Sequence, residues 1–307
     1  MQAGVVGVKC FLTHSGIDEF PNVTEKDLDE AMPIIAKYKL PLLAHCELYD
    51  KEIDSDFENH PTSYQHYLAS RPKYWENEAV ALMIRMCKKH QCPVHIVHVA
   101  SDEALTLIEA AKQEGLPITA ETCSQYIYFN AEAIPDGKTI YKCAPPIRDR
   151  ANNQHLKAAF LSGVLDFITT DHSPAPASIK EITSGNLKKA WGGIAGIQFL
   201  LTASWTALKD LMTLEQFIPL VTSKPAKFLK ADKKGTIAVG NDADIVIWNP
   251  RQTQVIQESG IFFKHKISPY IGQELSGVVL ETIVNGQTVY QNQTIQNKNK
   301  GQGLLKK

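Results

Sequence analysis

Short apolar runs alternate with amphipathic helical patterns over residues 4–229, and this alternation constrains the fold more than any other feature of the chain. The runs have the length and β-branched content of buried strands, and they occupy residues 4–11, 40–44, 93–99, 117–122 and 164–168. Apolar residues at helical spacing stand between them, as in residues 24–36. Strands joined through helices form parallel sheets with right-handed crossovers. The sequence therefore predicts an α/β fold, either a barrel or an open doubly wound sheet.

Ionisable side chains stand close to the carboxyl ends of four of these strand-like runs. Lys9 lies near the end of the first and His98 near the end of the third, while His45 directly follows the second. Asp171 comes after the last run, two residues before Ser173. Groups at the carboxyl ends of several strands are typical of barrel active sites. No Gly-x-Gly-x-x-Gly follows a strand, which disfavours dinucleotide binding. We therefore expect a barrel, but an incomplete one, because a closed barrel of this type needs about eight strands.

The composition changes near residue 235, where strand patterns replace helical ones. Residues 236–239 and 243–248 flank a Gly-Asn-Asp turn and are predicted to pair as a hairpin. Residues 278–284 and 287–289 flank Asn285-Gly286, and Asn-Gly is the strongest short hairpin signal. The final part of the chain is therefore predicted to be a small all-β appendage.

We expect two domains, a partial barrel over residues 1–230 and a β-rich part over residues 231–307. The 307 residues are 44% hydrophobic and 21% charged with a net charge of −1, which is ordinary for a globular protein and favours neither nucleic acid nor an anionic membrane as a partner. The six cysteines form no Cys-x-x-Cys pair, which favours a reducing cytoplasm. The sequence predicts neither a signal peptide nor a membrane-spanning segment.

Each candidate residue has an ordinary structural explanation when it is taken singly. A His at a strand end is more often hydrogen-bonded within the protein than bound to metal, and Lys9 alone is a snorkelling surface lysine. His95 lies an odd number of positions before His98 in the same run, and we expect it to face the other side of the strand. Cys143 alone is a core or lining residue, because nothing beside it marks an activated thiol.

Together, His45, His98 and Asp171 are a normal ligand set for Zn²⁺ or a similar divalent ion. Such an ion lowers the pKa of bound water to about 7 and polarises a carbonyl group. A nearby carboxylate can accept the proton of that water and return it to a leaving nitrogen. An ammonium group is not a metal ligand, so Lys9 would take part only in a neutral or chemically modified form.

Seven stretches together resemble the cyclic amidohydrolase family of dihydroorotases, hydantoinases and allantoinases. They occur in the family's order at residues 7–11, 45–47, 98–101, 121–123, 145–148, 170–174 and 234–246. The resemblance implies a TIM barrel with a small β-sandwich and two divalent ions, with zinc the first choice, bridged by a carboxylated Lys9. It implies His45 and His98 as ligands of the second ion, and Asp171 as a ligand of the first ion and as the general base.

Within the family, the sequence is most similar to allantoinases, on residues 15–21, 142–148, 191–198 and 265–270. This similarity implies hydrolysis of allantoin to allantoate, with Cys143 and Ser173 against the substrate ring. Ala144 stands before the Pro-Pro pair where dihydroorotases usually have Asn. A hydantoinase or dihydropyrimidinase is the alternative enzyme.

One family element is missing from the sequence. The first barrel strand of the family ends in a His-x-His pair that binds the first ion, and no His-x-His occurs in this chain. We therefore expect an N-terminally truncated chain that lacks the first barrel strands and half of the β-sandwich. The alternative to an enzyme is a non-catalytic fragment that keeps part of the metal site. Complete members of the family are often homotetramers, and we expect the same of the complete protein.

Overall fold

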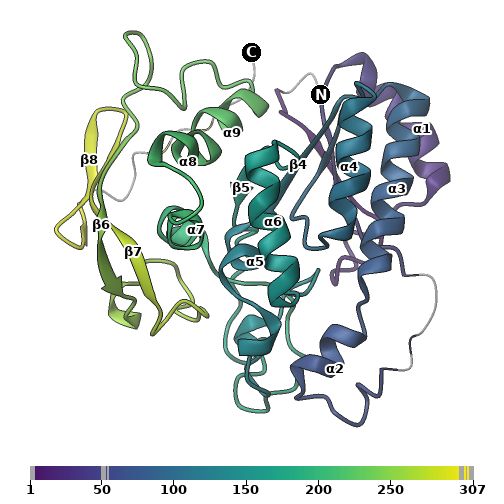
Figure 1. The fold of residues 1–307 in the computed structure, drawn as a ribbon, viewed down its shortest axis with the longest axis horizontal. Helices are drawn as coiled ribbons and strands as arrows, with labels where there is room; N and C mark the ends of the chain where they lie inside the picture. Colours follow the sequence, from purple (N-terminus) through teal and green to yellow (C-terminus); the bar gives the residue numbers. More distant parts are fainter. Residues whose placement is uncertain (1–3, 50–52, 54, 297–300, 302, 304–307) are drawn as a thin grey trace.

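A five-stranded parallel sheet forms the centre of the structure, which is a computed structural model that describes residues 4–49, 53, 55–296, 301 and 303 (Figure 1). Its strands lie in chain order, each hydrogen-bonded to the next. They are β1 (Val8–Phe11), β2 (Leu42–His45), β3 (Val94–Ile96), β4 (Ile118–Cys123) and β5 (Phe167–Thr169). The predicted α/β fold is therefore confirmed, and each strand is shorter than or equal in length to the apolar run that predicted it.

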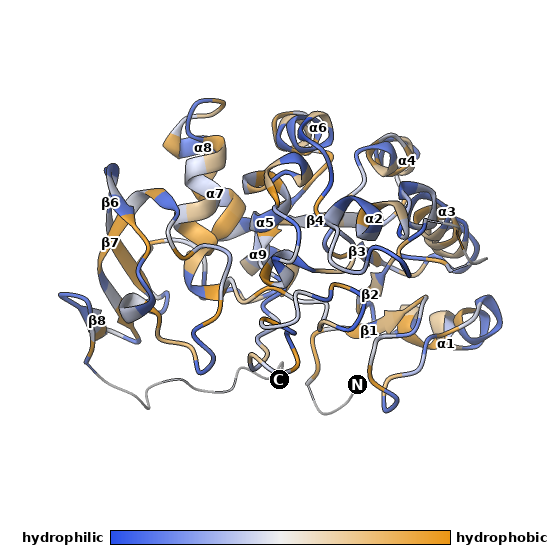
Figure 2. Ribbon diagram, turned by 90° about the horizontal axis from the view of Figure 1, so that it is seen from below, coloured by the Kyte–Doolittle hydropathy of each residue, from blue (hydrophilic) through white to orange (hydrophobic). Residues whose placement is uncertain are grey.

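Four crossover helices cover one face of this sheet, as both views show (Figures 1 and 2). They are α1 (Glu25–Lys37), α3 (Lys73–His90), α4 (Glu103–Gln113) and α6 (Arg150–Ser162). Their inward stripes supply fully buried residues such as Met32, Met83 and Ile108, which remove apolar surface from water and stabilise the sheet. Lys9 and His95 share one face of the sheet. Two short helices, α2 (Tyr64–Ala69) and α5 (Ser124–Tyr128), follow β2 and β4 in the chain.

Three helices stand between the parallel sheet and a second, antiparallel sheet (Figure 1). They are α7 (Leu200–Leu208), α8 (Leu214–Val221) and α9 (Ser223–Phe228). The second sheet has the order β6 (Ile245–Val255), β7 (Glu274–Val284), β8 (Gln287–Gln291) and β9 (Thr294–Ile295). Short 3₁₀ turns lie at Ala131–Ala133, Thr139–Tyr141, Ile197–Phe199 and Glu258–Gly260.

The two predicted hairpins have different outcomes. Asn285 and Gly286 join β7 to β8 with φ values of 50° and 73°, the pair of positive values that a two-residue hairpin turn of type I′ requires. That hairpin is confirmed. The pairing of residues 236–239 with residues 243–248 is wrong, because residues 236–239 form no strand and β6 pairs with β7.

Within the described part of the chain, no helix is both long and apolar enough to cross a membrane.

The start of α1 shows how local sequence fixes an element boundary. Thr24 accepts the backbone N–H of Asp27 at 3.3 Å, and Asp27 accepts the backbone N–H of Thr24 at 2.8 Å. This reciprocal capping box satisfies two helix-end donors that would otherwise lack protein partners.

We predict that Thr24→Ala lowers the free energy of unfolding by about 1 kcal/mol, because the cap is lost. Urea unfolding monitored by circular dichroism measures the change. Thr106→Ala is the matched control, since Thr106 is an exposed interior residue of α4. Equal destabilisation by both substitutions would show that the box contributes nothing specific.

Candidate metal centre

The register of the parallel strands brings the predicted ligands to one end of the sheet. Phe11 is paired with His45 across β1 and β2, and Lys9 lies two residues earlier on the same face. Pairing of Ala44 with Ile96 puts the carboxyl ends of β2 and β3 side by side, so that His98 follows just beyond His45. Parallel strands direct these ends to a common edge, and the predicted clustering of His45 and His98 there is found.

His45 and His98 form a buried pair at this edge. Their exposed fractions are 6% and 4%, and His45 Nδ1 lies 2.9 Å from His98 Nε2. Burial, followed by the charges of His45 and Lys9, holds the pKa of His98 well below its usual range, so that its ring is neutral. Two buried imidazole rings whose nitrogens lie this close together suit a divalent ion. His98 also has a left-handed φ of 43°, an unusual conformation for a non-glycine residue.

A buried carboxylate fixes the orientation of His45. Glu47 is 1% exposed, and its Oε2 lies 2.9 Å from His45 Nε2. Burial opposes ionisation of Glu47, but the Arg71 guanidinium and the His45 ring outweigh it and hold the Glu47 pKa below its ordinary value. A carboxylate on one ring nitrogen selects the tautomer and directs the other nitrogen outward, as around metal-bound histidines. Arg71 could not be found from the sequence, because it lies in a polar segment with no motif.

Lys9 and Asp171 stand at opposite edges of the sheet, on β1 and just after β5. Five flat strands would separate the outermost two by roughly 19 Å. The Asp171 charge nevertheless acts on the Lys9 pKa, so the two groups lie closer together than this. Both side chains keep solvent access, yet the protein around them removes enough water to lower the Lys9 pKa and raise the Asp171 pKa. These opposite shifts favour the neutral forms, an amine that can be modified and a carboxyl group that can hold a proton.

The four predicted ligands are therefore only partly gathered. Among the described residues, one set of three possible ligand side chains has its ligand atoms within 4.8 Å of one another, namely Asp56, His60 and His66. Asp171 therefore does not come this close to both rings of the buried histidine pair. That set lies in the segment before and within α2, and an ordinary ion pair of 3.2 Å between Asp56 and His60 accounts for two of its members.

The expectation that His95 faces the other side of the strand, away from the candidate ligands, is wrong. His95 is paired with Leu43, which is paired with Lys9, so all three lie on one face. His95 Nδ1 lies 2.8 Å from Thr119 Oγ1, and its Nε2 lies 3.1 Å from Glu121 Oε2. Strand alternation does not extend to His98 because β3 ends at Ile96.

The predicted substrate residues lie beside this edge in three loops that hydrogen-bond to one another. Tyr67 Oη donates to the carbonyl of Cys143 at 2.6 Å. The Ser173 hydroxyl accepts the indole N–H of Trp191 at 2.9 Å. A Cβ on Gly193 would lie 2.4 Å from Ser173 Oγ, so glycine is required for this close approach. Cys143 itself is buried with a thiol pKa raised to about 12 by burial, which leaves it protonated and lining the wall rather than nucleophilic.

Lys180 joins these loops and has no sequence motif. Its side chain is buried, and Nζ donates to the carbonyls of Lys142, Trp191 and Gly193 at 2.9, 2.9 and 2.6 Å. Burial lowers the Lys180 pKa to about 7, and the three carbonyl acceptors compensate for the lost hydration of the ammonium group. One cation therefore ties together the segments around Cys143 and Ser173.

The Amidohydrolase family model matches residues 6–289 of the chain. The chain therefore belongs to the amidohydrolase family. The allantoinase of Arabidopsis thaliana is 40% identical over 302 residues, which cover 94% of this chain and 60% of that protein. The allantoinase of Solibacter usitatus is 34% identical over 313 residues, which cover 100% of this chain and 68% of that protein. These identities put the chain in the allantoinase branch of the family.

Solved structures agree on the fold. The L-hydantoinase (dihydropyrimidinase) from Arthrobacter aurescens matches with a TM-score of 0.89 and 27% identity, over 96% of this chain and 67% of the other. The chain spans about 60% of the length of the Arabidopsis relative. The parallel sheet thus corresponds to part of a barrel, as its five strands indicate.

Glu76 on α3 supports the end of β3 from outside the sheet. It is 2% exposed, and its Oε1 accepts the backbone N–H of Ala100 at 2.7 Å, two residues beyond His98. Burial raises the Glu76 pKa to about 7, against which Arg148 and the backbone hydrogen bonds act only in part. An unfolded Glu titrates near 4.5, so the folded protein binds this proton more tightly.

We predict that Glu76 makes the protein less stable as the pH rises from about 4.5 to about 7, because the unfolded carboxyl group ionises before the folded one. The unfolding free energy of the wild type minus that of Glu76→Gln falls by about 3 kcal/mol between pH 4.5 and pH 8. Urea unfolding across this range measures the difference. Glu109→Gln on the exposed side of α4 is the control, and a pH-independent difference for Glu76→Gln would contradict the raised Glu76 pKa.

We predict that Lys180→Met lowers the unfolding free energy by about 3 kcal/mol, because three buried carbonyls lose their donor. Hydrogen exchange of residues 171–194 then accelerates, while that of α1 follows global unfolding alone. Lys189→Met on the exposed side of the same loop is the control and leaves both quantities unchanged. Unaltered exchange around Ser173 in Lys180→Met would exclude Lys180 as the tie between the loops.

Proposed function

We propose that the complete protein hydrolyses a cyclic amide in a metal-dependent reaction, and that the substrate is allantoin and the product allantoate. The observation that carries this proposal is the buried His45–His98 pair, in which the His98 ring is neutral, beside Lys9 and Asp171, in a chain whose relatives are named allantoinases.

The residues present fit a divalent-metal site. His98 Nε2 faces His45, whereas His98 Nδ1 is buried and has no hydrogen-bond partner among the described residues. Two divalent ions, with zinc the first choice, would be held by His45, His98, Asp171 and a carboxylated Lys9. The lowered Lys9 pKa favours the neutral amine, which is the form that reacts with CO₂. When bound, such ions polarise a carbonyl group and make water acidic near neutral pH.

The chain's own residues then orient the substrate and move one proton. Glu47 keeps His45 in one tautomer, and the loops tied by Lys180 hold the wall near Cys143 and Ser173 in place. Asp171 accepts the proton of the attacking water and returns it to the ring nitrogen as the ring C–N bond breaks and a carboxylate forms. Its raised pKa favours holding the proton between the two events.

A chimera tests this proposal, in which the chain replaces the matching segment of the Solibacter usitatus allantoinase. We predict that the chimera binds about two equivalents of divalent metal and hydrolyses allantoin. Asp171→Asn lowers kcat by about 10³ or more with little change in KM, because proton transfer is lost while substrate contacts remain. The exposed Asp210→Asn is the control and keeps full activity.

A substrate panel in the same assay separates the candidate activities. A hydantoinase or dihydropyrimidinase is the second candidate, because the Arthrobacter aurescens hydantoinase shares the fold at a TM-score of 0.89. Faster turnover of dihydrouracil or a 5-substituted hydantoin than of allantoin would establish that alternative. A chimera that folds but binds no metal and turns over none of these would identify the chain as a non-catalytic member. Gel filtration of the chimera also tests the proposed homotetramer.

A further inference from the structure

Three side chains outside the candidate metal centre are spaced as ligands of a further ion. Asp56, His60 and His66 each offer one possible ligand atom, and these atoms lie within 4.8 Å of one another. All three come from the segment that leaves β2 and runs into α2. Two imidazoles and a carboxylate are a normal ligand set for Zn²⁺ and similar divalent ions.

The His66 ring lacks a protein partner for one of its nitrogens. His66 Nδ1 is buried and has no hydrogen-bond partner among the described residues. The His66 ring stacks on that of His60, with ring centroids 4.4 Å apart and an angle of 24° between the planes. The ion pair of Asp56 with His60 explains the positions of those two side chains but not that of His66. A buried polar atom without a partner is costly, and in a native protein it calls for a specific explanation.

Asn59 orients the carboxylate toward the histidine rings. Its Nδ2 donates to Asp56 Oδ1 at 2.6 Å, while Asp56 Oδ2 lies 3.2 Å from His60 Nε2. Outer hydrogen bonds of this kind hold carboxylate ligands in place and sustain metal affinity. Zinc–ligand bonds of about 2.0–2.1 Å require ligand atoms roughly 3.3 Å apart. The Asp56 and His60 side chains are about half exposed, so they are free to make the small rotations that this spacing needs.

Neighbouring loops fix the backbone between the two histidines. The Pro61 carbonyl accepts the backbone N–H of Leu187 at 2.7 Å, and the Thr62 carbonyl accepts that of Gly137 at 2.7 Å. Two loops that are far apart in the chain thus hold the connection between the rings. Because the backbone is already ordered, binding an ion there costs less conformational entropy than it would in a free segment.

Helix α2 connects these side chains to the loop that carries Cys143. Tyr64 Oη donates to the carbonyl of Ile147 at 3.1 Å, and Tyr67 Oη donates to that of Cys143 at 2.6 Å. His66 stands between the two tyrosines in α2. An ion on His66 therefore restrains the helix that supports this loop.

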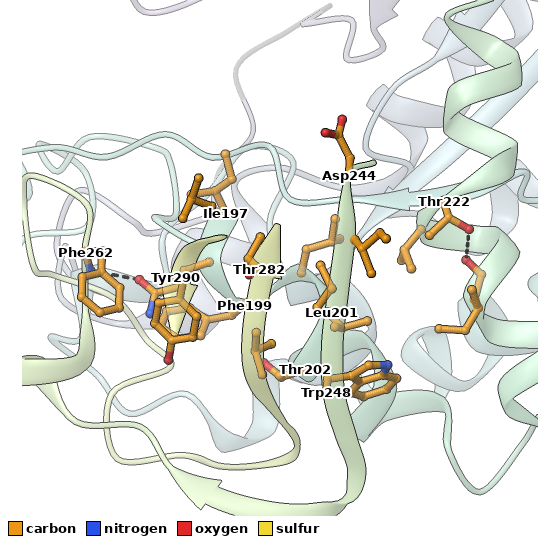
Figure 3. A pocket seen from close by; sticks show the side chains of 18 of the residues that line it. Ile197, Phe199, Leu201, Thr202, Thr222, Asp244, Trp248, Phe262, Thr282 and Tyr290 are labelled. Atoms are coloured by element: carbon orange, nitrogen blue, oxygen red, sulfur yellow. Dashed lines mark hydrogen bonds between the residues drawn. The ribbon is translucent and has the colours of Figure 1, made fainter. Parts of the chain in front are cut away.

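A groove of about 1390 Å³ between the antiparallel sheet and helices α7 and α8 offers no comparable ligand set (Figure 3). Leu201 and Trp248 contribute to its largely apolar lining. The described residues that line it include no histidine and no cysteine, and its carboxylates Asp242 and Asp244 face the Lys234 ammonium. Metal-binding chemistry outside the candidate metal centre is therefore concentrated in the segment before and within α2.

We propose that Asp56, His60 and His66 bind one divalent transition-metal ion, with zinc the first choice, and that water completes its coordination. The ion has a structural role, because it ties the segment before α2 to α2 itself and so stabilises the support of the Cys143 loop. This proposal does not depend on the proposed reaction, since none of the three ligands takes part in it.

Zinc binding by the purified chain tests this site. The chain is freed of metal with a chelator and titrated with Zn²⁺ alone, and the zinc kept after desalting is measured by mass spectrometry. We expect His60→Gln and Asp56→Asn each to retain one equivalent less than the wild type, and Asn59→Ala to weaken this binding by about tenfold or more. Added Zn²⁺ slows hydrogen exchange of residues 55–70 in the wild type but not in His60→Gln. The His60 side chain is half exposed, so His60→Gln keeps the fold, which circular dichroism checks.

His155→Gln is the matched control, because His155 on α6 also pairs with a carboxylate, that of Asp102 at 2.6 Å, and its side chain is 65% exposed. It retains as much zinc as the wild type. Equal zinc content in the wild type, His60→Gln and Asp56→Asn would overturn the proposal. Zinc that slows exchange around His98 but not in residues 55–70 would also overturn it and assign the ion to the candidate metal centre. None of these readouts requires turnover, so failure of the allantoinase proposal leaves this test intact.

Discussion

The register between β1, β2 and β3 is the constraint on which the candidate site depends. Pairing Phe11 with His45, and Ala44 with Ile96, directs the carboxyl ends of these strands to one edge. A shift of the strand register by one residue would move the His45 side chain to the other face of the sheet, away from His98 and Glu47. The buried apolar residues of α1, α3 and α4 hold the register, because sliding one strand would expose them. The geometry of the candidate site therefore depends on ordinary core packing, and the ionisable groups stand only where the strands end.

Burial at this edge is possible because the ionisable groups are arranged in compensating pairs. His98 is neutral, and Glu47 keeps its charge only because Arg71 and His45 face it. Removing one partner of such a buried pair leaves an uncompensated charge and costs far more than a surface ion pair. Lys180 follows the same rule with backbone carbonyls in place of a carboxylate. The rigidity of the loops near Ser173 thus comes from satisfying a buried cation.

Local signals predicted local structure well. The Asn285-Gly286 turn depends on neighbouring residues, and it is found as the sequence indicated. The capping box at Thr24 is local in the same way. The strand expected at residues 236–239 depends on a pairing partner, so its sequence alone could not decide the outcome. The clustering of His45 with His98 was predictable because strand ends coincide in parallel sheets. Arg71 and Lys180 were not, since each reaches its partners from an irregular segment whose path no periodicity encodes.

Position within the sheet explains why half of the candidate site is buried and half is accessible. His45 and His98 follow β2 and β3, which have neighbours on both sides, so packing alone fixes their separation. Lys9 and Asp171 belong to the outermost strands, and their separation follows the curvature of the whole sheet. Curvature in a barrel wall is set by closure, which fixes strand tilt and stagger together. The histidine pair is therefore a property of this chain by itself, whereas the distance between Lys9 and Asp171 depends on whatever strands complete the wall.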